Sequence, residues 1–191
     1  MCQKMLNLDN EDPIIKNNKL IPIKFNDNLK VISIAFFFKK TNAIIWRGPI
    51  KHNIIKQFLD DVVWGKLDYL VIDFPPGTGD EAISVSQLLN DITGTIIVST
   101  PQEVALLDAI KTINFSKKVN LPVLGLIENM SGEIFGEGSV EETAKKEKIP
   151  FLGRLKLKVQ IREAGDKGIP FAINGSFNTI TDRIQKICNE K

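Results

Sequence analysis

Runs of branched and aromatic residues alternate along this chain with longer polar or amphipathic segments. The apolar runs have the length and composition of buried strands, and the segments between them have the length and spacing of helices. We expect strands at residues 29–38, 69–74, 95–99 and 122–127, with a weaker one at 151–155. We expect helices at residues 50–63, 81–91, 103–119, 140–148 and 178–189.

This alternation is typical of a mostly parallel sheet covered by helices. Crossovers of this length between parallel strands are almost always right-handed, so the pattern predicts an α/β, doubly wound sheet flanked by helices. Residues 16–19 (KNNK) are expected to form an irregular surface segment. With no internal repeat and no linker, we interpret residues 1–191 as a single domain.

Composition narrows the range of partners. The 191 residues are 43% hydrophobic and 25% charged, with a net charge of +2. This balance does not favour nucleic acid or a membrane surface as a partner. The opening residues do not have the pattern of a secretory signal, so we expect a cytoplasmic protein. The two cysteines, Cys2 and Cys188, are far apart in sequence, which favours ordinary thiols over a disulfide or a Cys-x-x-Cys site.

The most informative stretch is residues 70–80, LVIDFPPGTGD. An apolar strand there ends in Asp73, and a carboxylate at the carboxyl end of a parallel strand faces the crevice where such sheets bind ligands. Asp73 is therefore suited to holding a magnesium ion through water. Two prolines end the strand, and Gly77 and Gly79 allow backbone amides to point at a phosphate. The alternative is a strand, a tight turn and a capped helix with no ligand.

Four segments together resemble one known family. They are IWRGP at residues 45–49, WGKLDYLVIDFPPGTGD at 64–80, STPQEVAL at 99–106 and LGLIENMS at 124–131. In this order they are similar to the Mrp-type iron–sulfur cluster carrier ATPases, which are MinD-like P-loop NTPases. The resemblance implies ATP with Mg²⁺ and a [4Fe-4S] cluster as ligands, a homodimer, and apoproteins as cluster acceptors.

The resemblance also implies roles for individual residues. Asp73 corresponds to the catalytic Walker B aspartate, which holds Mg²⁺ through water. Gly77 and Thr78 lie in the loop that corresponds to the nucleotide-sensing switch. Asn129 corresponds to the asparagine that contacts the adenine base, and a side-chain amide offers a base edge both a donor and an acceptor. The alternative for Asn129 is a turn residue at the end of a strand.

The sequence departs from this family in three places. It contains no G-x-x-x-x-G-K-[ST] string, which in the family forms the phosphate-binding loop. Residues 131–138 (SGEIFGEG) lack the family's Cys-x-x-Cys pair, and lysines in residues 155–158 (LKLK) replace a proline and an aspartate near the base pocket. We hypothesise that the chain lacks the first strand–helix unit, and that it is a fragment or needs a partner that supplies the missing strand.

These departures leave alternative functions open. The first is an ATP-binding carrier that transfers iron–sulfur clusters to apoproteins. The second is a truncated, non-catalytic derivative or partner subunit that binds neither ATP nor a cluster. A MinD-like positioning ATPase is a third, but it would need a membrane-binding helix longer than residues 180–188 provide. The resemblance implies ATP hydrolysis, whereas the lack of a Walker A loop favours a chain without it.

Overall fold

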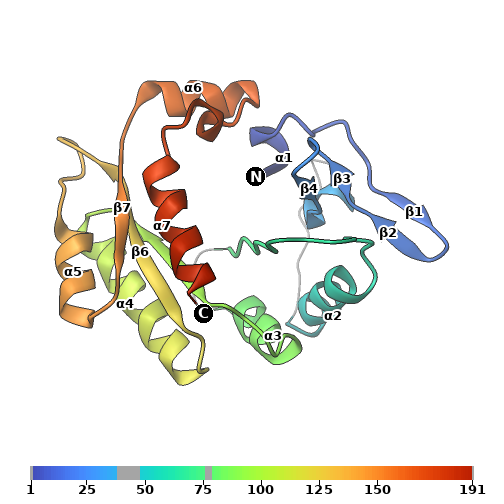
Figure 1. Cartoon of the computed structure of the whole chain (residues 1–191), viewed down its shortest axis with the longest axis horizontal. Helices are drawn as coiled ribbons and strands as arrows, with labels where there is room; N and C mark the ends of the chain where they lie inside the picture. The colour runs from blue at the N-terminus through green and yellow to red at the C-terminus, as the bar shows by residue number, and fades with distance from the viewer. Residues whose placement is uncertain (1, 38–47, 76–78, 191) are drawn as a thin grey trace. The chain divides into compact units, whose positions relative to one another are not determined.

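The computed structural model describes residues 2–37, 48–75 and 79–190 (Figure 1). Their contacts divide the chain into two compact units. The first unit contains the described residues up to 75, together with 79–88 and 162–170. The second contains residues 89–161 and 171–190.

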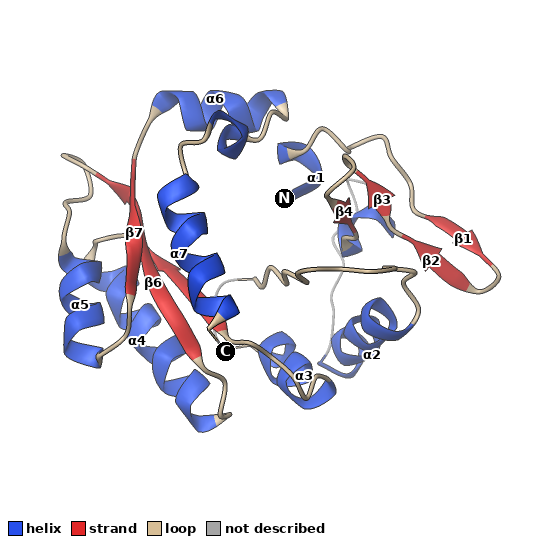
Figure 2. Ribbon diagram, in the orientation of Figure 1, coloured by secondary structure: helices blue, strands red, loops and turns tan. Residues whose placement is uncertain are grey.

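The second unit is built on a parallel three-stranded sheet. Its strands are β5 (Thr95–Ser99), β6 (Val123–Ser131) and β7 (Phe151–Lys156), in the order β5-β6-β7 (Figure 2). The central strand β6 is buried over most of its length, as expected for a strand covered on both faces. These strands confirm the predictions at residues 95–99, 122–127 and 151–155.

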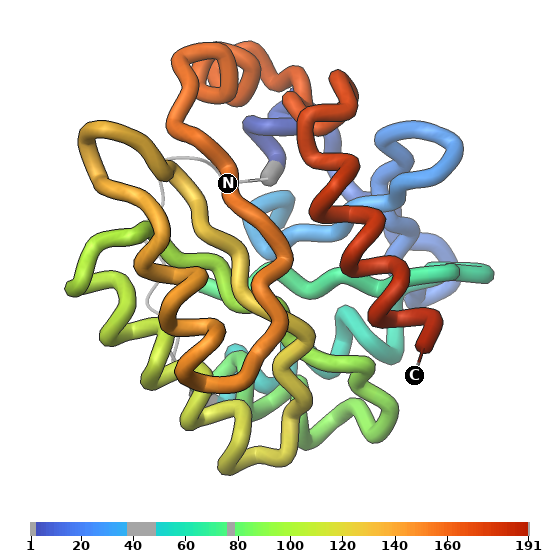
Figure 3. Tube along the Cα trace, turned by 60° about the vertical axis from the view of Figure 1, so that its left-hand side comes forward, coloured from blue at the N-terminus to red at the C-terminus, as the bar shows by residue number. Residues whose placement is uncertain are grey.

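Helices cover both faces of this sheet. On one face lie α4 (Glu103–Lys118) and α5 (Ser139–Glu147), whose Ile113 and Val140 are completely buried against Leu126 of β6. On the other face α7 (Asn178–Asn189) places Ile180 against Ile127 and Leu152. Figure 3 shows α7, in red, on the opposite side of the strands from α5. The predicted α/β class with helices on both faces of a parallel sheet is therefore confirmed.

A glycine in β7 permits the close approach of α7. Gly153 has φ of +154°, and a Cβ atom built on it would lie 2.6 Å from Ile180 Cγ1. Arg183 of α7 donates a hydrogen bond from Nη1 to the Leu152 carbonyl oxygen at 2.9 Å. The apolar contact and this hydrogen bond together hold α7 against β7.

The first unit contains short strands and two packed helices. Its elements are α1 (Cys2–Met5), β1 (Ile14–Lys16), β2 (Lys19–Ile21), β3 (Ile23–Lys24), β4 (Lys30–Val31), the 3₁₀ helix η1 (Ile34–Phe37), α2 (Gly48–Asp60) and α3 (Asp80–Leu88). Strands β1 and β2 form an antiparallel hairpin, as do β3 and β4. A small apolar core is formed by Leu8, Ile23 and Phe36. Helix α6 (Val159–Lys167) spans the boundary between the units, and the 3₁₀ helix η2 (Phe171–Asn174) follows it.

The KNNK segment at residues 16–19 is a hairpin turn instead of an irregular segment. Asn17 and Asn18 have φ of +52° and +58°. Two consecutive residues with positive φ form the tight turn whose twist matches a two-residue hairpin, and asparagine tolerates that conformation. The predicted surface position of residues 16–19 is confirmed, but the predicted irregular conformation was wrong because this turn chemistry was not recognised.

Two predicted strands were also wrong. Residues 29–38 contain only the two-residue strand β4, followed by η1, which turns Phe36 into the core of the first unit; Phe38 lies outside the described residues. Residues 69–74 form no strand, and Val71 is 87% exposed. A strand forms only where its backbone finds a partner, and no strand of the described chain pairs with residues 69–74.

The predicted helices agree with α2, α3, α4, α5 and α7, with ends shifted by three residues or fewer. Helix α6 was missed. None of the described helices has the length and apolar character needed to cross a membrane.

Candidate functional site

Asp73, the predicted Walker B residue, lies in the first unit. Its side chain is exposed, and it follows a segment with no regular secondary structure. Gly77 and Thr78, predicted to bind the nucleotide from the loop that corresponds to the switch, come next in the chain and lie outside the described residues. The described chain continues at Gly79, and Asp80 is the first residue of α3. Asp80 and Glu81 place negative charge in the first turn of this helix, where it is stabilising.

Asn129, the predicted base-contacting residue, lies in the second unit near the carboxyl end of β6. Its side chain is half-buried. The Asn129 Oδ1 atom accepts a hydrogen bond from the Met130 backbone N–H at 3.0 Å. Met130 has φ of +56°, which is uncommon for a residue with a Cβ atom. Of the four predicted site residues, Asp73 therefore lies in the first unit and Asn129 in the second. Gly77 and Thr78 lie outside the described residues.

Sequence reasoning missed a buried carboxylate beside Asn129. Glu128 is completely buried, and its carboxylate accepts hydrogen bonds from the Gly138 N–H at 3.0 Å and the Val140 N–H at 3.1 Å. These amides lie at the start of α5, so Glu128 of β6 satisfies backbone donors that the helix itself leaves unpaired. The signal in the sequence was an acidic residue within an apolar strand, which is rarely buried without a partner.

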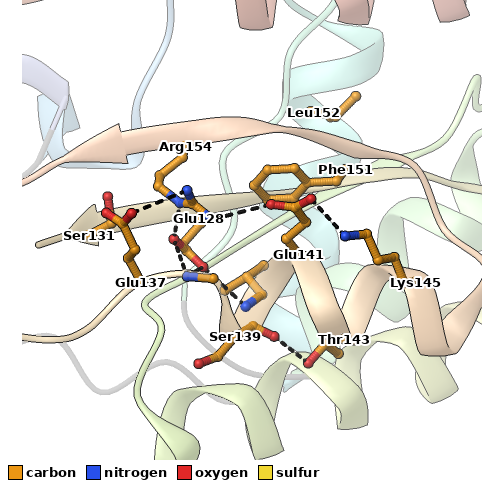
Figure 4. Close-up of polar contacts among 12 residues, drawn as sticks. Glu128, Ser131, Glu137, Ser139, Glu141, Thr143, Lys145, Phe151, Leu152 and Arg154 are labelled. Atoms are coloured by element: carbon orange, nitrogen blue, oxygen red, sulfur yellow. Dashed lines mark hydrogen bonds and ion pairs between the residues drawn. The ribbon is translucent and has the colours of Figure 1, made fainter.

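That partner is Arg154 of β7. Its Nε–H donates to Glu128 Oε1, and its Nη2 lies 3.3 Å from Glu141 Oε2 (Figure 4). The Arg154 guanidinium also lies 5.9 Å from the centre of the Phe151 ring. Burial lowers the pKa of Arg154, but the hydrogen bond that Arg154 donates to Glu128 and the charges of the surrounding carboxylates outweigh burial and raise the pKa overall. Arg154 is therefore held as a cation between carboxylates.

In the first unit, helices α2 and α3 pack through two polar pairs. Lys51 Nζ lies 2.6 Å from Glu81 Oε1, and His52 Nδ1 lies 3.1 Å from Ser84 Oγ. The hydrogen bond with Glu81 raises the pKa of Lys51, and the same hydrogen bond lowers the pKa of Glu81. An open hollow of about 390 Å³ beside them is lined by Pro49, His52, Asp80, Ile83 and Ser84.

The described residues do not form a metal or cluster site by themselves. Within residues 2–37, 48–75 and 79–190, no group of three or more His, Cys, Asp or Glu side chains is arranged to hold a metal ion. Cys188 on α7 is a free, half-buried thiol. Residues 131–138 contain no cysteine. A [4Fe-4S] cluster takes four thiolates, which this chain does not bring together in its described part.

Comparisons with known proteins agree on one family. The family model for ParA, described as NUBPL iron-transfer P-loop NTPase, matches residues 1–190. An iron–sulfur cluster carrier protein of Methanocaldococcus jannaschii is 46% identical over 197 aligned residues. That alignment covers 95% of this chain and 68% of the relative, so the chain spans about two thirds of the relative's length.

Solved structures give the same result for the fold. A nucleotide-binding protein from Archaeoglobus fulgidus, solved in complex with ADP, matches with a TM-score of 0.71 and 31% identity, over 87% of this chain and 68% of that chain. The cell division ATPase MinD of Pyrococcus furiosus matches with a TM-score of 0.55 and 23% identity, over 76% and 63% of the two chains. The second likeness extends to the fold alone, which is MinD-like.

Proposed function

Because this chain belongs to the ParA family, in the group described as NUBPL iron-transfer P-loop NTPases, we propose that it carries iron–sulfur clusters to acceptor apoproteins. The observation that carries this proposal is the continuous match through residues 1–190, together with 46% identity to a protein named as such a carrier. The proposed setting is the cytoplasm.

The carrier is proposed to bind ATP with Mg²⁺ through Asp73, Gly77, Thr78 and Asn129. Bound Mg²⁺ supplies charge neutralisation at the phosphates. The exposed Asp73 carboxylate is a suitable acceptor for the water ligands of such an ion. Asn129 has its Nδ2 donors available within the described chain, since only its Oδ1 is engaged, by the Met130 N–H. A nucleotide-binding relative solved with ADP supports this part of the proposal.

The iron–sulfur cluster is cargo in this proposal, and its ligands come from more than one chain. Each chain has two cysteines, so four thiolates require a second copy or the acceptor protein. We therefore propose a homodimer as the carrier form.

A second candidate is a non-catalytic subunit that keeps the fold and binds neither ATP nor a cluster. One feature of the sequence favours it: residues 131–138 contain no cysteine pair. In that case the chain acts through its surfaces, as the partner of another subunit.

One experiment separates these candidates. The purified chain is reconstituted anaerobically with iron and sulfide, desalted, and mixed with an apoprotein that gains activity when it receives a [4Fe-4S] cluster. The carrier proposal expects retained iron, followed by recovery of acceptor activity faster than with free iron and sulfide. If the chain retains no iron and does not accelerate recovery of acceptor activity, the carrier proposal is wrong and the second candidate is supported.

A further inference from the structure

The carboxyl end of β6 contains a β-bulge at Asn129 and Met130. Glu128 lies opposite Arg154 in the parallel register, and Ser131 lies opposite Lys156. Three steps along β6 thus match two steps along β7. Met130 takes up the extra length with its φ of +56°, a conformation that crowds any residue with a Cβ atom. Bulges of this kind are common beside functional sites, where they redirect a side chain.

Both ends of the bulge are anchored. Before it, the buried Glu128 is held by Arg154 and by two backbone N–H groups at the start of α5 (Figure 4). After it, the Leu157 N–H donates to the Ser131 carbonyl oxygen at 2.9 Å, and Ser131 Oγ–H donates to the Leu155 carbonyl oxygen at 3.3 Å. The strained residue is therefore held in place by contacts on either side of it.

The bulge sets the orientation of the Asn129 side chain. The Met130 N–H, turned by the positive φ, donates to Asn129 Oδ1 at 3.0 Å. This contact leaves the two Nδ2 donors and one lone pair of Oδ1 for a ligand. An adenine edge offers a ring-nitrogen acceptor next to an amino donor, which matches this amide. Guanine has an oxygen acceptor where adenine has the amino group, so its oxygen would face Asn129 Oδ1.

We propose that Glu128, Met130 and Ser131 are positioning residues that hold the Asn129 amide for adenine and so make the site prefer adenine over guanine nucleotides. This inference rests on the proposed function, which assigns Asn129 to the base. Without the anchors, Met130 relaxes toward negative φ, and the Met130 N–H no longer fixes the Asn129 amide.

The test compares the dissociation constants of Mg-ADP and Mg-GDP for the full chain and its variants, by displacement of a fluorescent ADP analogue. Glu128→Gln weakens the first anchor, and Ser131→Ala removes the hydroxyl of the second in case the first variant does not fold. We expect each variant to lower the ratio of the GDP to the ADP dissociation constant by up to about tenfold, which corresponds to the free energy of one hydrogen bond. Adding Met130→Gly to Glu128→Gln is expected to restore part of the preference, because glycine adopts positive φ without strain.

Glu141→Gln is the matched control. It removes a half-buried carboxylate of α5 that contacts the same Arg154 but does not contact the bulge, and it is expected to keep the preference of the wild-type chain. If the wild-type chain binds ADP selectively and the anchor variants keep that selectivity, the bulge is only a structural feature and the inference is wrong. If the wild-type chain binds neither nucleotide, the nucleotide part of the proposed function fails as well.

Discussion

Arg154 of β7 lies opposite Glu128 of β6 in the parallel register, and the two side chains form an ion pair between Nε and Oε1. The Glu128 carboxylate is completely buried, while the Arg154 side chain is 26% exposed. A buried carboxylate is tolerated only when its charge and its lone pairs are satisfied. This pair therefore joins the centre of the sheet to the start of α5.

Replacing Arg154 by methionine is expected to destabilise the second unit by about 3–5 kcal/mol, because it leaves the buried charge of Glu128 unpaired. Urea unfolding followed by circular dichroism measures this change. The double variant with Glu128→Leu is expected to cost less than the sum of the two single changes, because neither charge is then left alone. Strictly additive losses would mean that the two residues do not interact.

Acid is expected to weaken the contact between α2 and α3. The hydrogen bond from Lys51 lowers the pKa of Glu81, so the folded state binds the Glu81 proton less tightly than the unfolded state. This stabilisation is present above the ordinary glutamate pKa of about 4.3 and is lost as the pH falls through the lower, folded value. Thermal unfolding of wild type and Lys51→Met between about pH 3 and 7 measures the difference between them.

The difference in unfolding midpoint between wild type and Lys51→Met is expected to be largest at the upper end of that pH range and to become smaller as the pH falls. Arg162→Met serves as a control, because it removes an exposed pair with Asp166 in which both side chains are more than half exposed. A gap between wild type and Lys51→Met that does not change with pH would contradict the assignment.

The stability of the second unit is expected to depend on the volume of the side chains packed between the sheet and α4. Ile113 is completely buried in it, so Ile113→Ala should cost about 2–5 kcal/mol through lost burial and the cavity that remains. Val104→Ala, on the same helix, removes a side chain that is 76% exposed and should change stability by about 0.5 kcal/mol or less. Chemical denaturation of both variants tests this, and equal losses would contradict the packing of α4.

Gly153→Ala is expected to separate α7 from β7. The new Cβ would lie 2.6 Å from Ile180 Cγ1, and such overpacking typically costs about 1–3 kcal/mol. Gly165→Ala is the matched control, because a Cβ in that α6 position meets nothing within 4 Å. Thermal unfolding should show a lower midpoint for the first variant alone. A Gly153→Ala variant as stable as wild type would mean that α7 lies farther from the strand.

The second unit was the part of the fold that sequence patterns predicted best. Strand β5 and the first half of β6 are apolar runs, and the helices place apolar residues against the sheet, so local pattern and burial agree there. Residues 69–74 have the same apolar pattern as β5, but a pattern does not supply the neighbouring strand that a ladder requires. In residues 29–38 the apolar run forms the 3₁₀ helix η1, which buries Phe36 in the core of the first unit.

The roles of Asp73 and Asn129 in the candidate site stay predictions. They were assigned because the residues around them resemble a family. The anchors Glu128 and Arg154 were missed because they are 26 positions apart in sequence and meet only when β6 and β7 pair. The bulge at Met130 was also missed, because methionine carries no local signal for positive φ.

The measurement that tests the account most directly is an equilibrium titration of the chain and its Asn129→Ala variant with a fluorescent ADP analogue in Mg²⁺. Asn129→Asp keeps the size of the side chain but removes its Nδ2 donors, and so serves as a second variant. We expect saturable binding by the wild-type chain that is about tenfold weaker in both variants, as loss of one hydrogen bond implies. A wild-type chain that does not bind the analogue, or variants that bind it equally well, would contradict the assignment of this site.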